Sequence, residues 1–205
     1  MGQYYRQLIG DKNGKVIAVH YCRSLLPNGQ TDYDGVKLME HSWLENWFVN
    51  GICKRMYNNP LRVLWVGDYA NEVGDFDFNI PSQPEIPDYY AAWGEWVLPS
   101  LVEADGEFSI VGKFLLNHDT REYIEISNDG YLYYSQPTEK SPLPWVIHPL
   151  PLLTAIGNDR GFGDFHEGNY GYENVGIWAW HLLEIADGAP MEYEEMSTLG
   201  FVEER

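Results

Sequence analysis

The densest group of residues able to do chemistry lies between Ile156 and Trp180. Six glycines punctuate the stretch: Gly157, Gly161, Gly163, Gly168, Gly171 and Gly176. Titratable side chains lie among them, including Asp159, Arg160, Asp164, His166 and Glu167. Glycine loses much backbone entropy on folding, so a folded chain keeps it where φ is positive or another group approaches closely. The stretch is therefore the first candidate for a functional loop.

The glycine spacing argues against a phosphate-binding loop. The stretch contains neither G-x-x-x-x-G-K-[ST] nor G-x-G-x-x-G. Its carboxylates would also repel a phosphate unless Arg160 or a metal intervened. A P-loop is therefore excluded.

The same carboxylates raise the question of a metal. Asp159, Asp164 and Glu167 are hard oxygen ligands of the kind calcium prefers, but their spacing matches neither an EF-hand nor a regular repeat. A zinc site built from histidines would need a pair such as H-E-x-x-H, which the sequence lacks. Cys22 and Cys53 form no C-x-x-C motif. We expect no metal and no cofactor.

Catalysis is the alternative function. The sequence contains no G-x-S-x-G nucleophile motif. An enzyme or ligand-binding protein acting on a nucleotide-like or peptide substrate would place its site where the glycine-rich stretch meets Asp68, His148 and His181. In that hypothesis Arg160 holds an anion, and Asp164 or His181 moves protons. A structure that scatters these side chains would remove it.

Charge points to a different function. The formal net charge is −18, and 20 of the 31 acidic residues fall in two blocks, 63–112 and 161–205. The first block has no Lys or Arg, and the second has only Arg205. Such surfaces repel nucleic acid and attract basic proteins, although acidity can also serve solubility alone.

We therefore predict a non-enzymatic interaction protein that binds and inhibits or modulates a basic host protein, for example a nucleic-acid-binding or defence protein. Aromatic side chains are the usual anchors of such interfaces. The predicted partner-binding residues combine aromatic and charged groups: Tyr69, Tyr89, Tyr90, Trp93, Asp159, Arg160, Asp164 and Glu167. Direct binding of nucleic acid is not expected.

The elements that position these residues follow from local patterns. Two β-prone runs, 4–9 and 16–23, flank the Asn13-Gly14 turn and predict a hairpin. Ser42 and Glu45 fit a capping box, and apolar residues at helical spacing predict one long helix over about 43–57. Residues 62–67 read as a buried strand.

The second half of the chain reads mainly as strands. Residues 108–116, 123–127 and 131–134 predict a three-stranded antiparallel meander, and 175–185 predict a final strand. The segment 152–156 fits either a short helix or a buried strand. We expect one α+β domain over 1–205, mostly antiparallel sheet with long Gly/Pro-rich loops, ending in an acidic, partly flexible tail over 187–205.

Several short motifs spread along the chain carry a resemblance. They are Met1-Gly-Gln-Tyr-Tyr5, the KLMEHSW segment ending at Trp43, the GDYA segment ending at Ala70, the HPLPLLTA segment ending at Ala155, and Gly157-Asn-Asp-Arg-Gly161. With them the chain resembles an uncharacterised family of short bacterial and phage proteins. The resemblance implies a bacterial or phage setting and no established activity. No apolar run reaches about 18 residues, so a cytoplasmic protein is expected.

Overall fold

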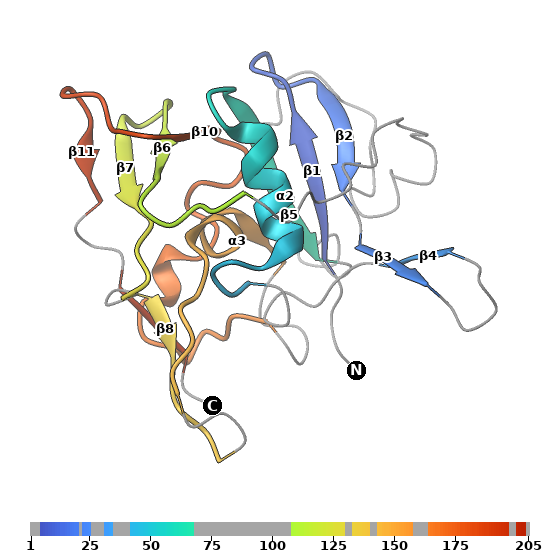
Figure 1. Cartoon of the computed structure of the whole chain (residues 1–205), viewed down its shortest axis with the longest axis vertical. Coiled ribbons are helices and arrows are strands. Elements are labelled where there is room, and N and C mark those ends of the chain that lie inside the picture. The colour runs from blue at the N-terminus through green and yellow to red at the C-terminus, as the bar shows by residue number, and fades with distance from the viewer. Residues whose placement is uncertain are drawn as a thin grey trace.

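The computed structural model describes residues 5–20, 22–25, 31–34, 42–67, 108–129, 133–139, 143–157, 164–196 and 200–203. These residues form an α+β fold in which a mostly antiparallel sheet is packed against few helices (Figure 1). The α+β class and the mostly antiparallel sheet predicted from the sequence are confirmed.

In the described part of the chain the main sheet has eight strands in the order β11-β7-β6-β10-β5-β1-β2, with β9 also pairing with β5. Its strands are β1 (Tyr5–Gly10), β2 (Val16–His20), β5 (Leu61–Gly67), β6 (Phe114–Asn117), β7 (Glu122–Glu125), β9 (Ala155–Ile156), β10 (Leu182–Ala186) and β11 (Glu194–Glu195). Two pairs lie apart from it: β3 (Cys22–Leu25) with β4 (Thr31–Asp34), and β8 (Tyr133–Ser135) with β12 (Phe201–Glu203). Among the described residues the helices are α2 (Trp47–Met56), α3 (Pro149–Thr154) and the 3₁₀ turn η3 (Tyr172–Asn174).

The first hairpin forms as predicted. β1 and β2 pair antiparallel, and the Asp11 carboxylate accepts hydrogen bonds from the backbone N–H groups of Asn13 and Lys15. The second strand ends earlier than expected, at His20. The chain then continues into β3, which pairs with β4 outside the main sheet.

The helix is shorter than the one predicted over 43–57. α2 begins at Trp47, because Glu45 takes a left-handed φ of 63° that no helix accommodates. Asn46 is the N-cap, and its side-chain oxygen accepts from the N–H groups of Phe48 and Val49. Glu45 instead accepts hydrogen bonds from Asn50 and Ser109. The predicted capping box therefore gives way to an asparagine cap four residues later.

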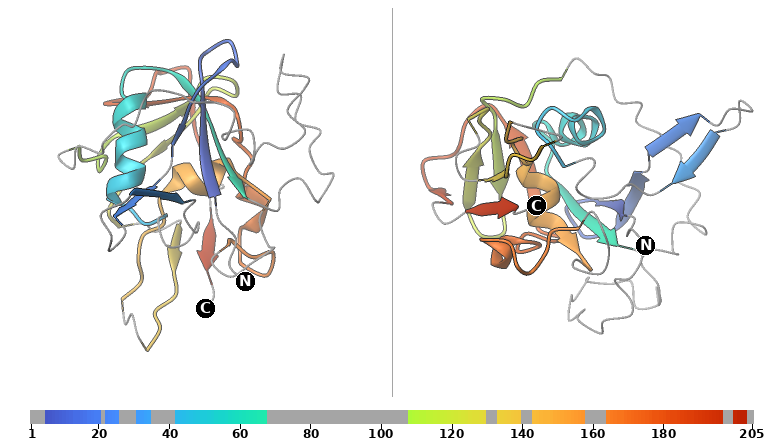
Figure 2. Two further views of the ribbon diagram at one scale, coloured as in Figure 1. Left: turned by 90° about the vertical axis from the view of Figure 1, so that its right-hand side faces the viewer. Right: turned by 90° about the horizontal axis from the view of Figure 1, so that it is seen from below.

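The core lies between α2 and the central strands of the sheet (Figure 2). Val63 and Trp65 of β5 pack in the same apolar cluster as Phe48 and Ile52 of α2. Leu64 and Val66, which alternate with them along β5, belong to a smaller cluster on the other face, together with Trp180. β5 is thus buried on both faces, which explains its continuous apolar run.

The predicted meander is wrong in its third strand. β6 and β7 form an antiparallel hairpin, but β8 pairs in parallel with β12. The first strand also starts later, at Phe114, because residues 110–113 form a turn at Gly112, whose φ is 78°. The predicted final strand likewise starts at Leu182, after the turns and η3 that occupy 171–180.

Candidate functional site

Four of the predicted site residues lie in the described part of the chain: His148, Asp164, Glu167 and His181. The remaining predictions lie outside the described residues: Asp68, Tyr69, Tyr89, Tyr90, Trp93, Asp159 and Arg160.

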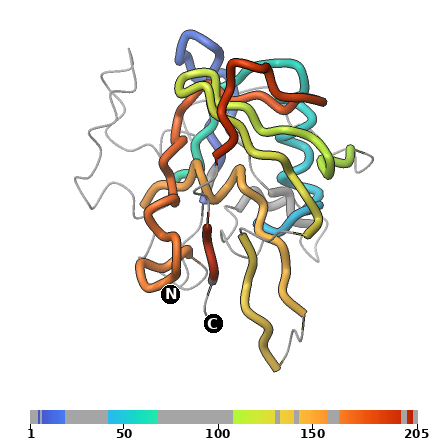
Figure 3. Tube along the Cα trace, turned by 90° about the vertical axis from the view of Figure 1, so that its left-hand side faces the viewer, coloured from blue at the N-terminus to red at the C-terminus, as the bar shows by residue number. Residues whose placement is uncertain are grey.

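The described part of the glycine-rich stretch packs against two strands of the fold. Residues 164–181 coil beside β12, where Val202 donates a backbone hydrogen bond to Tyr170 (Figure 3). Gly171 has a φ of +79°, and a Cβ there would lie 1.4 Å from the carbonyl oxygen of Gly200. A Cβ on Gly176 would lie 2.4 Å from the carbonyl oxygen of Ala155. These two glycines are required by close backbone approach.

The acidic side chains of the stretch have different surroundings. Asp164 is fully buried next to Phe165 in the chain. The ring of Phe165 packs edge-on against that of Phe201, with 5.0 Å between the ring centroids. Glu167 is exposed. Only Glu167 of this pair thus presents its carboxylate to an external partner.

His148 is fully buried and caps α3. Its Nδ1 accepts a hydrogen bond from the backbone N–H of Leu150, so in the neutral ring the proton lies on Nε2. Nε2 lies 3.4 Å from Sγ of Cys53 and donates toward it. Burial lowers the pKa of His148 to about 3, and burial, with the nearby Glu45 charge, raises the pKa of the Cys53 thiol. The pair is neutral, and the imidazole has no free lone pair to activate the thiol as a nucleophile.

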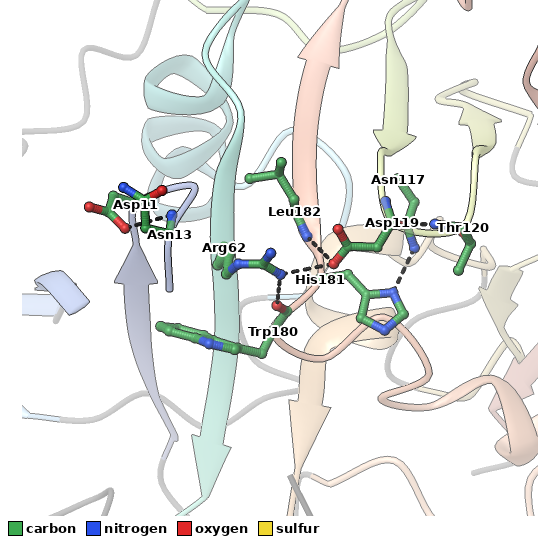
Figure 4. A network of polar contacts seen from close by, with 9 residues as sticks. All are labelled: Asp11, Asn13, Arg62, Asn117, Asp119, Thr120, Trp180, His181 and Leu182. Atoms are coloured by element: carbon green, nitrogen blue, oxygen red, sulfur yellow. Dashed lines mark hydrogen bonds and ion pairs between the residues drawn. The ribbon is translucent and has the colours of Figure 1, made fainter. Parts of the chain in front are cut away.

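His181 belongs to a polar network that joins β5, β10 and the turn between β6 and β7 (Figure 4). Its Nδ1 lies 2.9 Å from Nδ2 of Asn117. The side-chain oxygen of Asn117 accepts from the backbone N–H groups of Asp119 at 3.0 Å and Thr120 at 3.3 Å. These two bonds fix the orientation of the amide, so Nδ2 donates to His181. His181 therefore carries its proton on Nε2.

Arg62 and Asp119 form the other half of this network. Nη1 of Arg62 donates to Oδ2 of Asp119 at 2.8 Å and to the carbonyl oxygen of Trp180 at 2.8 Å. The backbone N–H of Leu182 donates to the same carboxylate oxygen at 3.1 Å. Burial would raise the pKa of Asp119, but the bonds from Arg62 and Leu182 outweigh it and the pKa is lowered. The ion pair holds the turn after β6 against β5 and the start of β10.

The His181 tautomer also bears on metal binding. A histidine that binds a metal through Nε2 donates its Nδ1–H to an acceptor, whereas Nδ1 of His181 faces the Asn117 amide N–H. Within the described residues no group of three or more His, Cys, Asp or Glu side chains is placed to hold a metal ion.

A second polar cluster was missed by the sequence analysis. His118 lies between Tyr193 and Glu184: its Nδ1 is 2.7 Å from the Tyr193 hydroxyl, and its Nε2 is 2.7 Å from Oε2 of Glu184. The ring of Tyr193 packs edge-on against His118. These contacts fasten the segment before β11 to the turn between β6 and β7.

β11, the strand thus fastened, forms one edge of the sheet and is acidic. It pairs in parallel with β7 and places Glu194 opposite Glu122. Backbone bonds from Glu194 to Arg121 and from Met196 to Tyr123 hold it there. We call this region the acidic edge; its carboxylates are those of Glu122, Glu125, Glu192, Glu194 and Glu195. All except the half-buried Glu122 are exposed. No local pattern predicts a pairing between residues some 70 positions apart.

No protein-family model matches this chain, and neither a curated protein nor a solved structure matches it significantly. Among the helices that the structure describes, none has the length and apolarity needed to cross a membrane.

Proposed function

We propose that this chain is a non-enzymatic interaction protein that binds a basic partner protein through its acidic edge. The observation that carries the proposal is the pairing of Glu194 with Glu122 at the rim of the sheet, with exposed glutamates also at Glu125 on β7, at Glu195 on β11 and at Glu192 just before β11. Two carboxylates held on paired neighbouring strands repel each other. A cationic partner relieves this repulsion, so the arrangement favours complex formation over the free protein.

The acidic edge is also held in place before any partner arrives. The His118–Tyr193 contact and the two backbone bonds from β11 anchor it to the hairpin of β6 and β7. A surface that is already ordered loses less conformational entropy on binding than a flexible acidic tail. The ordered surface therefore supports specific recognition of a partner over non-specific attraction. The negative charge of its carboxylates calls for a positively charged partner.

The proposed setting rests on the resemblance to bacterial and phage proteins. We place the chain in the cytoplasm of a bacterial cell, where it inhibits or modulates a basic host protein. A nucleic-acid-binding or defence protein fits the charge, because its binding surface is built to accept phosphates. An inhibitor that presents carboxylates in place of those phosphates, as a nucleic-acid mimic, is the most specific form of this proposal.

Capture from a bacterial lysate tests the proposal. The tagged chain is used as bait at about 0.1 M and about 1 M salt, between which the Debye length falls from about 10 Å to about 3 Å. We expect a basic protein that is retained at low salt and released at high salt. Recovery of no protein, or of one whose retention ignores salt, would sink the electrostatic proposal.

A further inference from the structure

We propose that His181 and Asn117 form a pH-sensitive latch, which holds the turn between β6 and β7 while His181 is neutral and releases it when the ring takes up a second proton. This inference goes beyond the proposed function and needs no partner for its test.

The latch rests on the hydrogen-bonding roles of the Asn117 amide. Asn117 is completely buried, and its oxygen already serves two backbone N–H groups, those of Asp119 and Thr120. Its Nδ2 therefore has to donate, and the partner at 2.9 Å is Nδ1 of His181. A neutral ring with its proton on Nε2 satisfies this arrangement completely.

A protonated ring cannot keep the hydrogen bond in which Nδ1 of His181 accepts from Asn117. The imidazolium carries a hydrogen on both nitrogens, so Nδ1–H would point at an N–H donor of Asn117. Rotating the amide by 180° would give Nδ1–H an acceptor, but Nδ2 would then face the N–H groups of Asp119 and Thr120. The remaining choice is for the half-buried ring to move toward solvent, which leaves the buried Asn117 amide without its acceptor. Either outcome weakens the turn.

The turn connects several parts of the sheet. Asp119 on the turn binds Arg62 of β5 and the backbone N–H of Leu182 in β10. The carbonyl oxygen of Arg121, at the end of the turn, accepts from Glu194 of β11. Opening of the latch is therefore transmitted to the ion pair and to the strand that carries the acidic edge.

Some of the charged groups around His181 raise its pKa and others lower it. Burial lowers the pKa of His181, and the Arg62 charge adds to this effect. The carboxylates of Asp119 and Glu122 oppose it, but the pKa stays below its ordinary value. His118 lies on the same turn, with Glu184 and Tyr193 as its partners, so a variant of His118 serves as the control for His181.

Amide hydrogen exchange measured by NMR between about pH 8 and about pH 5 tests the latch. After correction for intrinsic exchange rates, protection of the Asp119 and Thr120 amides is compared with that of the β5 amides. In the wild type we expect their protection to fall as the pH is lowered, approaching about tenfold per pH unit once the open state is protonated. In His181→Gln the side-chain oxygen can accept from Asn117 without titrating, so the protection of the Asp119 and Thr120 amides should not change with pH. In His118→Gln the fall should persist.

Two results would overturn the latch: constant protection of these amides in the wild type, or an equal fall in His181→Gln. Loss of the fall in His118→Gln would assign the pH response to the other histidine and overturn it as well. Nitrogen-15 spectra of the wild-type ring provide a test that needs no variant. At about pH 8 they should show the His181 proton on Nε2, and a proton on Nδ1 would contradict the proposal.

Discussion

Nε2 of His148 lies 3.4 Å from Sγ of Cys53 in the fully buried space between α2 and the start of α3. Each side chain comes from a different half of the chain, and each is neutral in this position. The contact therefore contributes to packing between α2 and α3. The burial and neutrality of the two side chains lead to two predictions.

The first concerns stability and pH. The folded-state pKa of His148 is about 3, below the ordinary value of 6.5, so below pH 6.5 the unfolded chain takes up a proton that the folded chain does not. This contribution to stability is complete above pH 6.5 and is lost as the pH falls toward 3. Between these two pKa values the contribution of His148 to the free energy of unfolding falls by about 1.4 kcal/mol for each pH unit.

His148→Asn isolates that contribution, because asparagine can still cap α3 but does not titrate. We expect the variant to be less stable than the wild type at pH 8, since it loses the contact with Cys53. The difference, measured by urea unfolding, should shrink as the pH is lowered below 6.5. A difference that stays constant down to pH 5 would show that His148 is not buried as a neutral ring.

The second prediction concerns thiol reactivity. Cys53 is fully buried and its thiol pKa is raised, so it should react with iodoacetamide only when the protein opens. Mass spectrometry of digested protein measures its labelling specifically. The rate should increase with urea in step with unfolding. Rapid labelling in native buffer would mean that the thiol is accessible and that a catalytic role has to be reconsidered.

A third prediction separates architecture from function in the glycine-rich stretch. Gly171→Ala places a Cβ against the Gly200 carbonyl at a positive φ, and we expect a loss of about 2 kcal/mol or more. Gly168→Ala is the matched control, because nothing lies within 4 Å of its Cβ position. It should change the unfolding free energy by no more than about 0.5 kcal/mol. Equal losses in the two variants would contradict the packing described for Gly171.

Local patterns predicted the elements whose signals are local. The Asn13-Gly14 turn predicted the first hairpin, and the run 62–67, apolar from Val63 to Val66, predicted the buried strand at the centre of the sheet. The helix start was misplaced because Ser42 and Glu45 match a capping box in sequence, whereas the left-handed φ of Glu45 delays the helix to Trp47.

Relationships over long sequence distances could not be predicted in this way. The pairing of β8 with β12 joins Tyr133 to Phe201, and that of β7 with β11 joins Glu122 to Glu194. His181 was singled out as a candidate from its residue type and position. Its partner Asn117 lies 64 residues away, and it is this partner that sets the tautomer of the ring.

The binding affinity of the captured basic partner for two charge variants tests the proposed function most directly. The edge variant carries glutamine in place of Glu192, Glu194 and Glu195. The control removes three exposed carboxylates elsewhere, by Asp129→Asn, Glu139→Gln and Glu173→Gln. Both variants have the same net charge, so the comparison separates position from total charge.

We expect calorimetric titration at about 0.1 M salt to show at least a tenfold weaker Kd for the edge variant, equivalent to about 1.4 kcal/mol, and a much smaller change for the control. Circular dichroism should show both variants folded. If the edge variant binds like the wild type, or if both variants lose affinity equally, the acidic edge is not the binding surface.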